Sequence, residues 1–98
     1  MEIKEGASLA GLDLRMRPAL KGMEKVWKLA GQELVITCGL DGTHSAGSMH
    51  YYGLAVDGRT RYFSETEKKH VFTAIKKELG SSFDVIAHST HMHIEVKL

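Results

Sequence analysis

The segment from His91 to Lys97 alternates between polar and apolar side chains, in the order His-Met-His-Ile-Glu-Val-Lys. Such alternation predicts a β-strand with one apolar and one polar face. Successive side chains of a strand point to opposite sides, so His91, His93 and Glu95 are expected on the same face. This strand therefore presents two imidazoles and a carboxylate together.

A second predicted strand, from Phe83 to His88, directly precedes the first. Only Ser89 and Thr90 separate the two. If the connection is a tight hairpin, His88 and His91 form its closing cross-strand pair, with both rings on one side. Ser-Thr is a poor match for the favoured two-residue turns, so a looser connection is the alternative.

The rest of the chain predicts two helices and two more strands. Pro18 suits the start of a helix that Gly31 ends, and Ser64-x-x-Glu67 is a capping box for a helix that ends at Gly80. The predicted strands run from Leu34 to Cys38 and from Leu54 to Thr60, while residues 1–14 are only weakly patterned. This order predicts an α+β fold: a small, mainly antiparallel sheet with two helices packed on one side. We expect residues 1–98 to form a single domain, because the chain is too short for a second core.

Composition excludes several classes of partner. The formal net charge is +1, from 13 basic and 12 acidic residues, which gives no electrostatic basis for binding nucleic acid or an anionic membrane. Cys38 is the one cysteine, so an intrachain disulfide is impossible, and we expect it to be a small buried apolar residue. No transmembrane run and no signal peptide are evident, so we expect synthesis in the cytoplasm, with no oligomeric state implied.

His50 and Asp57 form the second polar motif. Their odd separation would put them on opposite faces of one strand, so we place His50 in the loop before it, with Gly53 permitting the bend. Gly53 and Ala55 share the face of Asp57 and leave space in front of the carboxylate. Two histidines and one carboxylate, with further histidines nearby, are the inventory of a catalytic zinc site.

These motifs resemble a known family. Ser48-x-His50-x-x-Gly53-x-Ala55-x-Asp57, followed by His91-x-His93-x-Glu95, is similar to the zinc D,D-peptidases, whose fold the Hedgehog signalling domain shares. The resemblance covers about residues 34–97, and the segment from Asp41 to Tyr51 is similar to small phage-encoded members.

The resemblance implies one zinc ion per chain, bound by His50, Asp57 and His93. It also implies catalytic roles for His91 and His88, either of which would take a proton from the attacking water. The implied reaction is hydrolysis of an amide bond in the peptide stem or cross-link of peptidoglycan, by a carboxypeptidase or an endolysin. The implied site of action is the cell wall or periplasm, reached through phage lysis or a virion.

Several positions depart from the family pattern or leave a role open. Thr90 stands where other members place an acidic general base, and Gly58 follows the metal-binding Asp where an apolar residue is common. The family arginine is missing, so Arg15 and Arg59 are the candidates for stabilising developing negative charge. Glu95 is expected either to hydrogen-bond a ligand histidine or to pair with a lysine.

Two alternatives follow from these departures. The chain could be a non-catalytic zinc-containing binding module, or a phage structural module with the same fold. His44 lies in the loop before the motif and is expected either to line the cleft or to be a solvated loop residue.

Overall fold

The computed structural model describes residues 1–40 and 48–98, and of Tyr51 the backbone alone; His44 lies outside these residues. Within them, five strands form one sheet in the order β1-β2-β3-β5-β4. The strands are β1 (Glu2–Ile3), β2 (Val35–Cys38), β3 (Ala55–Arg59), β4 (Phe83–Ala87) and β5 (His91–Val96). The β1–β2 pair is parallel and the other pairs are antiparallel.

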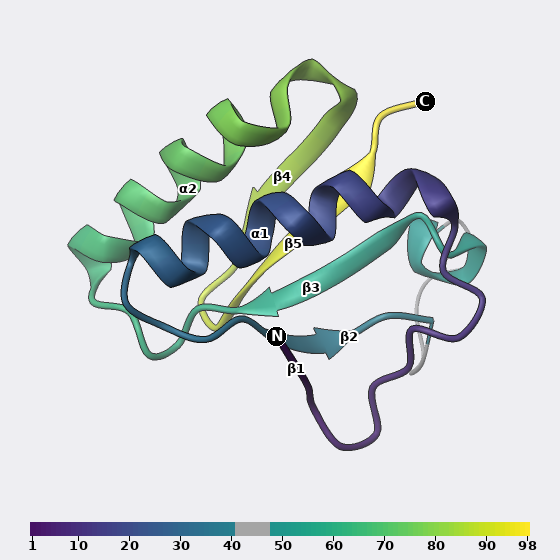
Figure 1. Ribbon diagram of the computed structural model, residues 1–98, viewed down its shortest axis with the longest axis horizontal. Coiled ribbons are helices and arrows are strands. Elements are labelled where there is room, and N and C mark those ends of the chain that lie inside the picture. Colours follow the sequence, from purple (N-terminus) through teal and green to yellow (C-terminus); the bar gives the residue numbers. More distant parts are fainter. Residues whose placement is uncertain (41–47) are drawn as a thin grey trace.

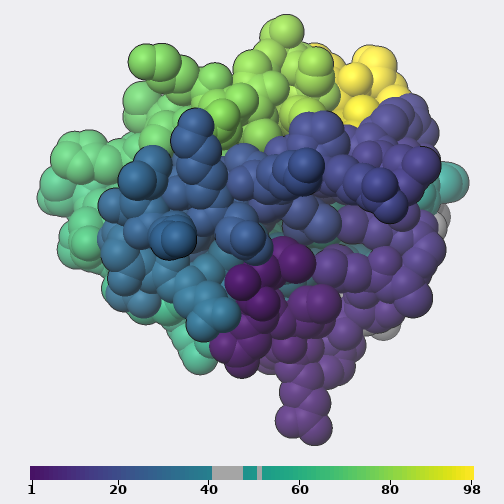
Figure 2. Space-filling view, viewed as in Figure 1, coloured from purple at the N-terminus to yellow at the C-terminus, as the bar shows by residue number. Residues whose placement is uncertain are grey.

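Two α-helices, α1 (Arg17–Leu29) and α2 (Glu65–Leu79), lie across the same face of this sheet (Figure 1). The described residues also form short 3-10 helices, which are η1 (Leu14–Met16), η2 (Met49–Tyr52) and η3 (Gly80–Ser82). In the space-filling view of Figure 2, α1 covers the middle of this side of the molecule, between α2 and the N-terminal residues. No helix among the described residues is long and apolar enough to cross a membrane.

Local sequence explains where both helices begin. Pro18 stands in the first turn of α1, where its missing N–H would lack a helical partner in any case. At α2, the Ser64 Oγ accepts from the Glu67 N–H at 3.1 Å, and the Ser64 N–H donates to Glu67 Oε1 at 2.8 Å. The predicted capping box is therefore present, and it satisfies two backbone N–H donors at the start of α2.

Alternation along β5 separates the core from the polar face. Met92, Ile94 and Val96 are buried in the core that the helices cover. The residues between them point to the other face, where register places Asp57 directly opposite His93. The helices thus cover one face of the sheet, and the other carries the predicted site residues.

The predicted α+β fold, with a mainly antiparallel sheet and two helices on one side, is confirmed. Two details differ from expectation. Glu2–Ile3 forms a parallel edge strand that residues 1–14 did not indicate, because two exposed residues leave no alternation to detect. The β2–β3 register also shifts between Ile36 and Cys38, so these two residues do not share a face, although the regular alternation of a strand from Leu34 to Cys38 would predict that they do.

Packing against α1 explains why glycine, rather than an apolar residue, follows Asp57 at position 58. A Cβ at this position would lie 2.7 Å from Met23 Cε and 3.4 Å from Trp27 Cζ2. Trp27 is fully buried, and its indole N–H donates to the Arg59 carbonyl at 2.8 Å. The large side chains of α1 therefore fill the space that a side chain after Asp57 would occupy.

Candidate metal centre

His50 is aimed at the sheet by the short helix η2. Ser48 caps this helix, and its Oγ accepts from the His50 N–H at 3.2 Å. Gly53 ends the helix in the left-handed region at φ 69°, and a Cβ there would lie 2.6 Å from the Gly11 carbonyl oxygen. The bend therefore needs glycine both for its conformation and for close backbone approach. It turns the chain into β3 and leaves His50 only 3% exposed.

The structure brings His50, Asp57 and His93 together. His50 Nε2 lies 3.3 Å from Asp57 Oδ1, His93 Nδ1 lies 2.9 Å from the same oxygen, and the two ring nitrogens are 3.1 Å apart. Metal–ligand bonds of about 2.0–2.2 Å hold neighbouring donor atoms roughly 3.0–3.5 Å apart, depending on geometry. The three donor atoms therefore already have the spacing of ligands around one ion.

Outer hydrogen bonds orient the two imidazoles. His50 Nδ1 lies 2.8 Å from the Gly39 carbonyl oxygen, and His93 Nε2 lies 2.7 Å from Glu95 Oε1. A carbonyl or carboxylate oxygen accepts, so these nitrogens donate, and in the neutral rings the lone pairs of His50 Nε2 and His93 Nδ1 face Asp57. Three acceptors converge on one point, and a cation placed there would satisfy all of them.

Without a metal ion, the surroundings of His93 favour its protonated form. The pKa of His93 is raised, chiefly by its hydrogen bond to Asp57 and further by Glu95, while burial opposes the change. Burial raises the pKa of Asp57, but hydrogen bonds with His50 and His93 outweigh it and hold the pKa well below its ordinary value. The site therefore favours an ionised carboxylate beside a positive charge.

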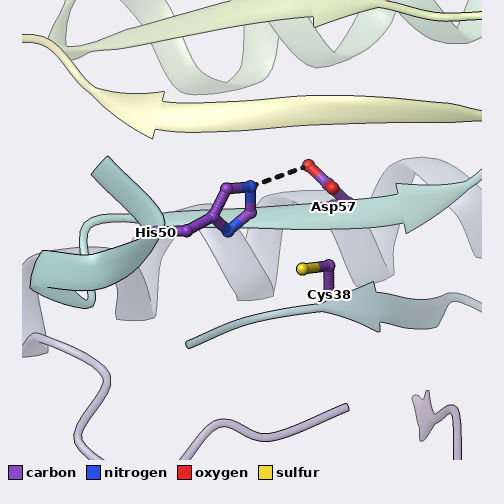
Figure 3. A group of neighbouring side chains, drawn as sticks. All are labelled: Cys38, His50 and Asp57. Carbon is purple, nitrogen blue, oxygen red and sulfur yellow. Dashed lines mark ion pairs between the residues drawn. The ribbon is translucent and has the colours of Figure 1, made fainter. Parts of the chain in front are cut away.

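Cys38 joins this group from the neighbouring strand β2. The ligand atoms of Cys38, His50 and Asp57 all lie within 4.8 Å of one another, and this group can hold a metal ion. Figure 3 shows the Cys38 thiol across from His50 and Asp57, with the three side chains contributed by β2, η2 and β3. The expectation that Cys38 is a small buried apolar residue is wrong. Cys38 is only half-buried, and it lies beside two candidate ligands.

His91 lies at the edge of the group and His88 lies beyond it. His91 Nε2 is 3.8 Å from Asp57 Oδ2, and the His88 and His91 rings stack at 4.7 Å, as expected for the pair that closes the hairpin. Thr90 Oγ1 lies 3.3 Å from His91 Nδ1. Burial lowers the pKa of His91; the Asp57 charge opposes that effect and His88 reinforces it, so the neutral ring is favoured. His88 is exposed and also borders a separate cavity of about 560 Å³ against α2.

The two arginine candidates differ in position. Arg15 makes an ion pair with Asp13, Nε to Oδ1 at 3.1 Å, at the cap of η1. Arg59 is two residues beyond Asp57 on β3 and directly opposite His91 on β5. It lines a cavity of about 280 Å³ beside Asp57 and His91, together with Lys4 and Arg61. Of the two candidates, Arg59 is thus the one that lies at the site.

In comparisons with known proteins, no family model and no curated protein matches this chain.

Proposed function

We propose that the protein is a zinc-dependent peptidase that hydrolyses an amide bond in the peptide stem or cross-link of peptidoglycan, as a D,D-carboxypeptidase or endolysin does. The observation that carries the proposal is the convergence of His50, Asp57 and His93 donor atoms within 3.3 Å of one another. The sequence motifs that resemble zinc D,D-peptidases contain the same three residues.

The donor set favours zinc over the hard cations. Imidazole nitrogen suits Zn²⁺, whereas Mg²⁺ and Ca²⁺ take mainly oxygen ligands. His50, Asp57 and His93 would hold the ion, and Glu95 would hold His93 in the orientation that directs Nδ1 at it. Of the two roles expected for Glu95, the hydrogen bond to a ligand histidine is therefore the one its position supports.

A zinc ion bound here would polarise the scissile carbonyl and lower the pKa of water from about 15.7 to about 7. His91 is our candidate for the general base. Burial lowers its pKa, which keeps the ring neutral and able to accept a proton near neutral pH. If His91 Nδ1 donates to the Thr90 hydroxyl oxygen at 3.3 Å, the lone pair of His91 is on Nε2, which faces Asp57. Thr90 occupies the position of the acidic base in other members of the family, and here it would instead orient the histidine base.

His88 has a supporting role in this proposal. Its ring stacks on His91, and it contacts the site through that ring, so it restricts the orientation of the base. We therefore assign proton transfer to His91 and positioning to His88.

The cationic cavity indicates where a substrate would bind. Lys4, Arg59 and Arg61 line it beside Asp57 and His91. Peptidoglycan stems carry carboxylates, and guanidinium groups bind carboxylates through paired hydrogen bonds. Arg59, directly opposite His91, is also our candidate for stabilising the negative charge that develops on the attacked carbonyl.

A non-catalytic zinc-binding module of the same fold is the second candidate function. It is the function expected if the Cys38 thiol, which lies close enough to the group to supply a further ligand, stays bound permanently. Structural zinc sites are closed by four protein ligands, whereas catalytic sites keep one position open.

The test is hydrolysis of a synthetic stem pentapeptide and of purified peptidoglycan by zinc-loaded protein, followed by mass spectrometry. We expect cleavage by wild type, loss of zinc and activity in His93→Ala, and a kcat lower by roughly 10²–10⁴-fold in His91→Gln with zinc retained. His70→Gln is the matched control, because His70 is exposed on α2. Zinc binding without any cleavage would favour the non-catalytic module, and no zinc binding would refute both functions.

A further inference from the structure

We propose that the Cys38 thiolate is a fourth ligand of the metal, so that the resting centre is closed by cysteine, two histidines and aspartate. This inference rests on metal binding by His50, Asp57 and His93, as proposed above. It adds a ligand that the sequence motifs do not contain, and it makes access to the metal conditional on displacing a thiolate.

A register shift in the sheet is what places Cys38 at the centre. Ile36 pairs with Gly58, and regular antiparallel register would next place Thr37 opposite Asp57. The irregularity instead makes Cys38 the partner of Asp57. Directly paired residues carry their side chains on the same face, and bulges commonly redirect a side chain in this way. The thiol therefore faces the polar side of the sheet rather than the core.

The distances require only a small adjustment. Cys38 Sγ lies within 4.8 Å of the ligand atoms of His50 and Asp57. Zinc–sulfur bonds of about 2.3 Å and zinc–nitrogen bonds of about 2.0–2.1 Å put the two donor atoms roughly 3.6 Å apart in a tetrahedral site. A thiol at the 4.8 Å limit would approach by about 1 Å to bind, which is small for an unbranched and half-buried side chain.

Charge also favours this fourth ligand. Two neutral imidazoles and one carboxylate leave a net charge of +1 on a divalent ion, in a place where His50 is 3% and Asp57 9% exposed. A thiolate makes the ion and its four ligands neutral as a unit. Coordination releases the thiol proton to solvent, and sulfur selects zinc or cobalt over magnesium and calcium.

The test uses Co²⁺ as a spectroscopic probe for the zinc position. Metal-free wild type and Cys38→Ser are titrated with Co²⁺ in thiol-free buffer, while visible d–d bands and the near-ultraviolet thiolate-to-cobalt charge-transfer band are recorded. We expect wild type to show both. Cys38→Ser should keep the d–d bands and lose the charge-transfer band. Thr37→Ser is the matched control and should retain both, because it changes the adjacent residue of β2 and leaves the thiol in place.

The outcomes separate this inference from the proposed function. Cobalt d–d bands without a charge-transfer band in wild type would overturn the Cys38 ligand and leave the three-ligand centre standing. No cobalt binding at all would overturn both. A second measurement needs no variant: X-ray absorption of the zinc-loaded wild type should show a zinc–sulfur distance of about 2.3 Å, and its absence would overturn the proposal.

Discussion

His93 Nδ1 lies 2.9 Å from Asp57 Oδ1 because the two residues are direct partners on the antiparallel strands β3 and β5. Cross-strand partners share a face, so the sheet alone places this imidazole beside this carboxylate. Residues 36 positions apart in the chain thereby become one half of the candidate metal centre. His50, from η2 just before the start of β3, completes it.

Glu95→Gln should weaken zinc binding by roughly 10–100-fold, because outer partners of ligand histidines commonly contribute this much. Glu95 Oε1 accepts from His93 at 2.7 Å and lies outside the three converging donor atoms. The measurement is a competitive chelator titration. Asp84→Asn is the control, because Asp84 pairs with Glu95 across β4–β5 but forms its ion pair with Lys97. Equal affinities for wild type and Glu95→Gln would show that Glu95 does not support the ligand.

Zinc should raise the melting temperature more at about pH 8 than at about pH 6. The pKa of His93 in the metal-free protein is raised above 6.5, first by Asp57 and also by Glu95, while burial opposes this. Protonated His93 therefore stabilises the metal-free fold fully below about pH 6.5, and this contribution disappears as pH rises through the folded pKa. A metal at Nδ1 needs that proton to leave.

The measurement for this prediction is thermal melting of metal-free and zinc-loaded protein at both pH values. At zinc concentrations near 100 times Kd, the stabilisation is about 2.7 kcal/mol. That corresponds to a rise of roughly 10–20 °C for a domain of this size. The titratable groups around His93 are His50, His91, Asp57 and Glu95, and a zinc effect independent of pH would contradict binding at these nitrogens.

Gly58→Ala should destabilise the fold by about 1–3 kcal/mol, because the added Cβ overfills the core. It would lie 2.7 Å from Met23 Cε and 3.2 Å from Leu34 Cδ1. Urea unfolding of the variant measures the loss. The double variant Met23→Leu/Gly58→Ala should lose less stability than the sum of the two single variants, since the Met23→Leu change removes the atom nearest to the added Cβ. Strict additivity would show that Met23 is not the source of the strain.

Ser64→Ala should lower the free energy of unfolding by about 1 kcal/mol, the usual effect of removing a helix cap. The Ser64 hydroxyl accepts from Glu67 N–H at 3.1 Å at the start of α2. Chemical denaturation measures the change, with Ser81→Ala as the control at an exposed position in η3. A Ser64→Ala protein as stable as the control would mean that packing, rather than the cap, fixes where α2 begins.

Much of the fold followed from local sequence. Pro18 and the Ser64–Glu67 capping box predicted both helices, and the alternation from Phe83 to His88 and from His91 to Lys97 predicted the C-terminal hairpin. The structure has the helices, and its hairpin strands, Phe83–Ala87 and His91–Val96, each end one residue earlier than predicted. These signals are readable because each depends on residues close together in the chain. The strand β1 was missed because its pairing with β2 depends on residues more than thirty positions away.

Sequence by itself determined the chemical inventory of the site. It supplies three imidazoles, from His50, His91 and His93, and two carboxylates, from Asp57 and Glu95, and the strand residues among them alternate so that they share a face. Only the tertiary structure decided how close they lie and which groups join them. The pairing of Asp57 with His93, the hydrogen bond from His93 to Glu95 and the register shift that brings in Cys38 all depend on alignment between strands. A shift of one residue turns a side chain to the other face, and such a shift leaves no mark in a local pattern.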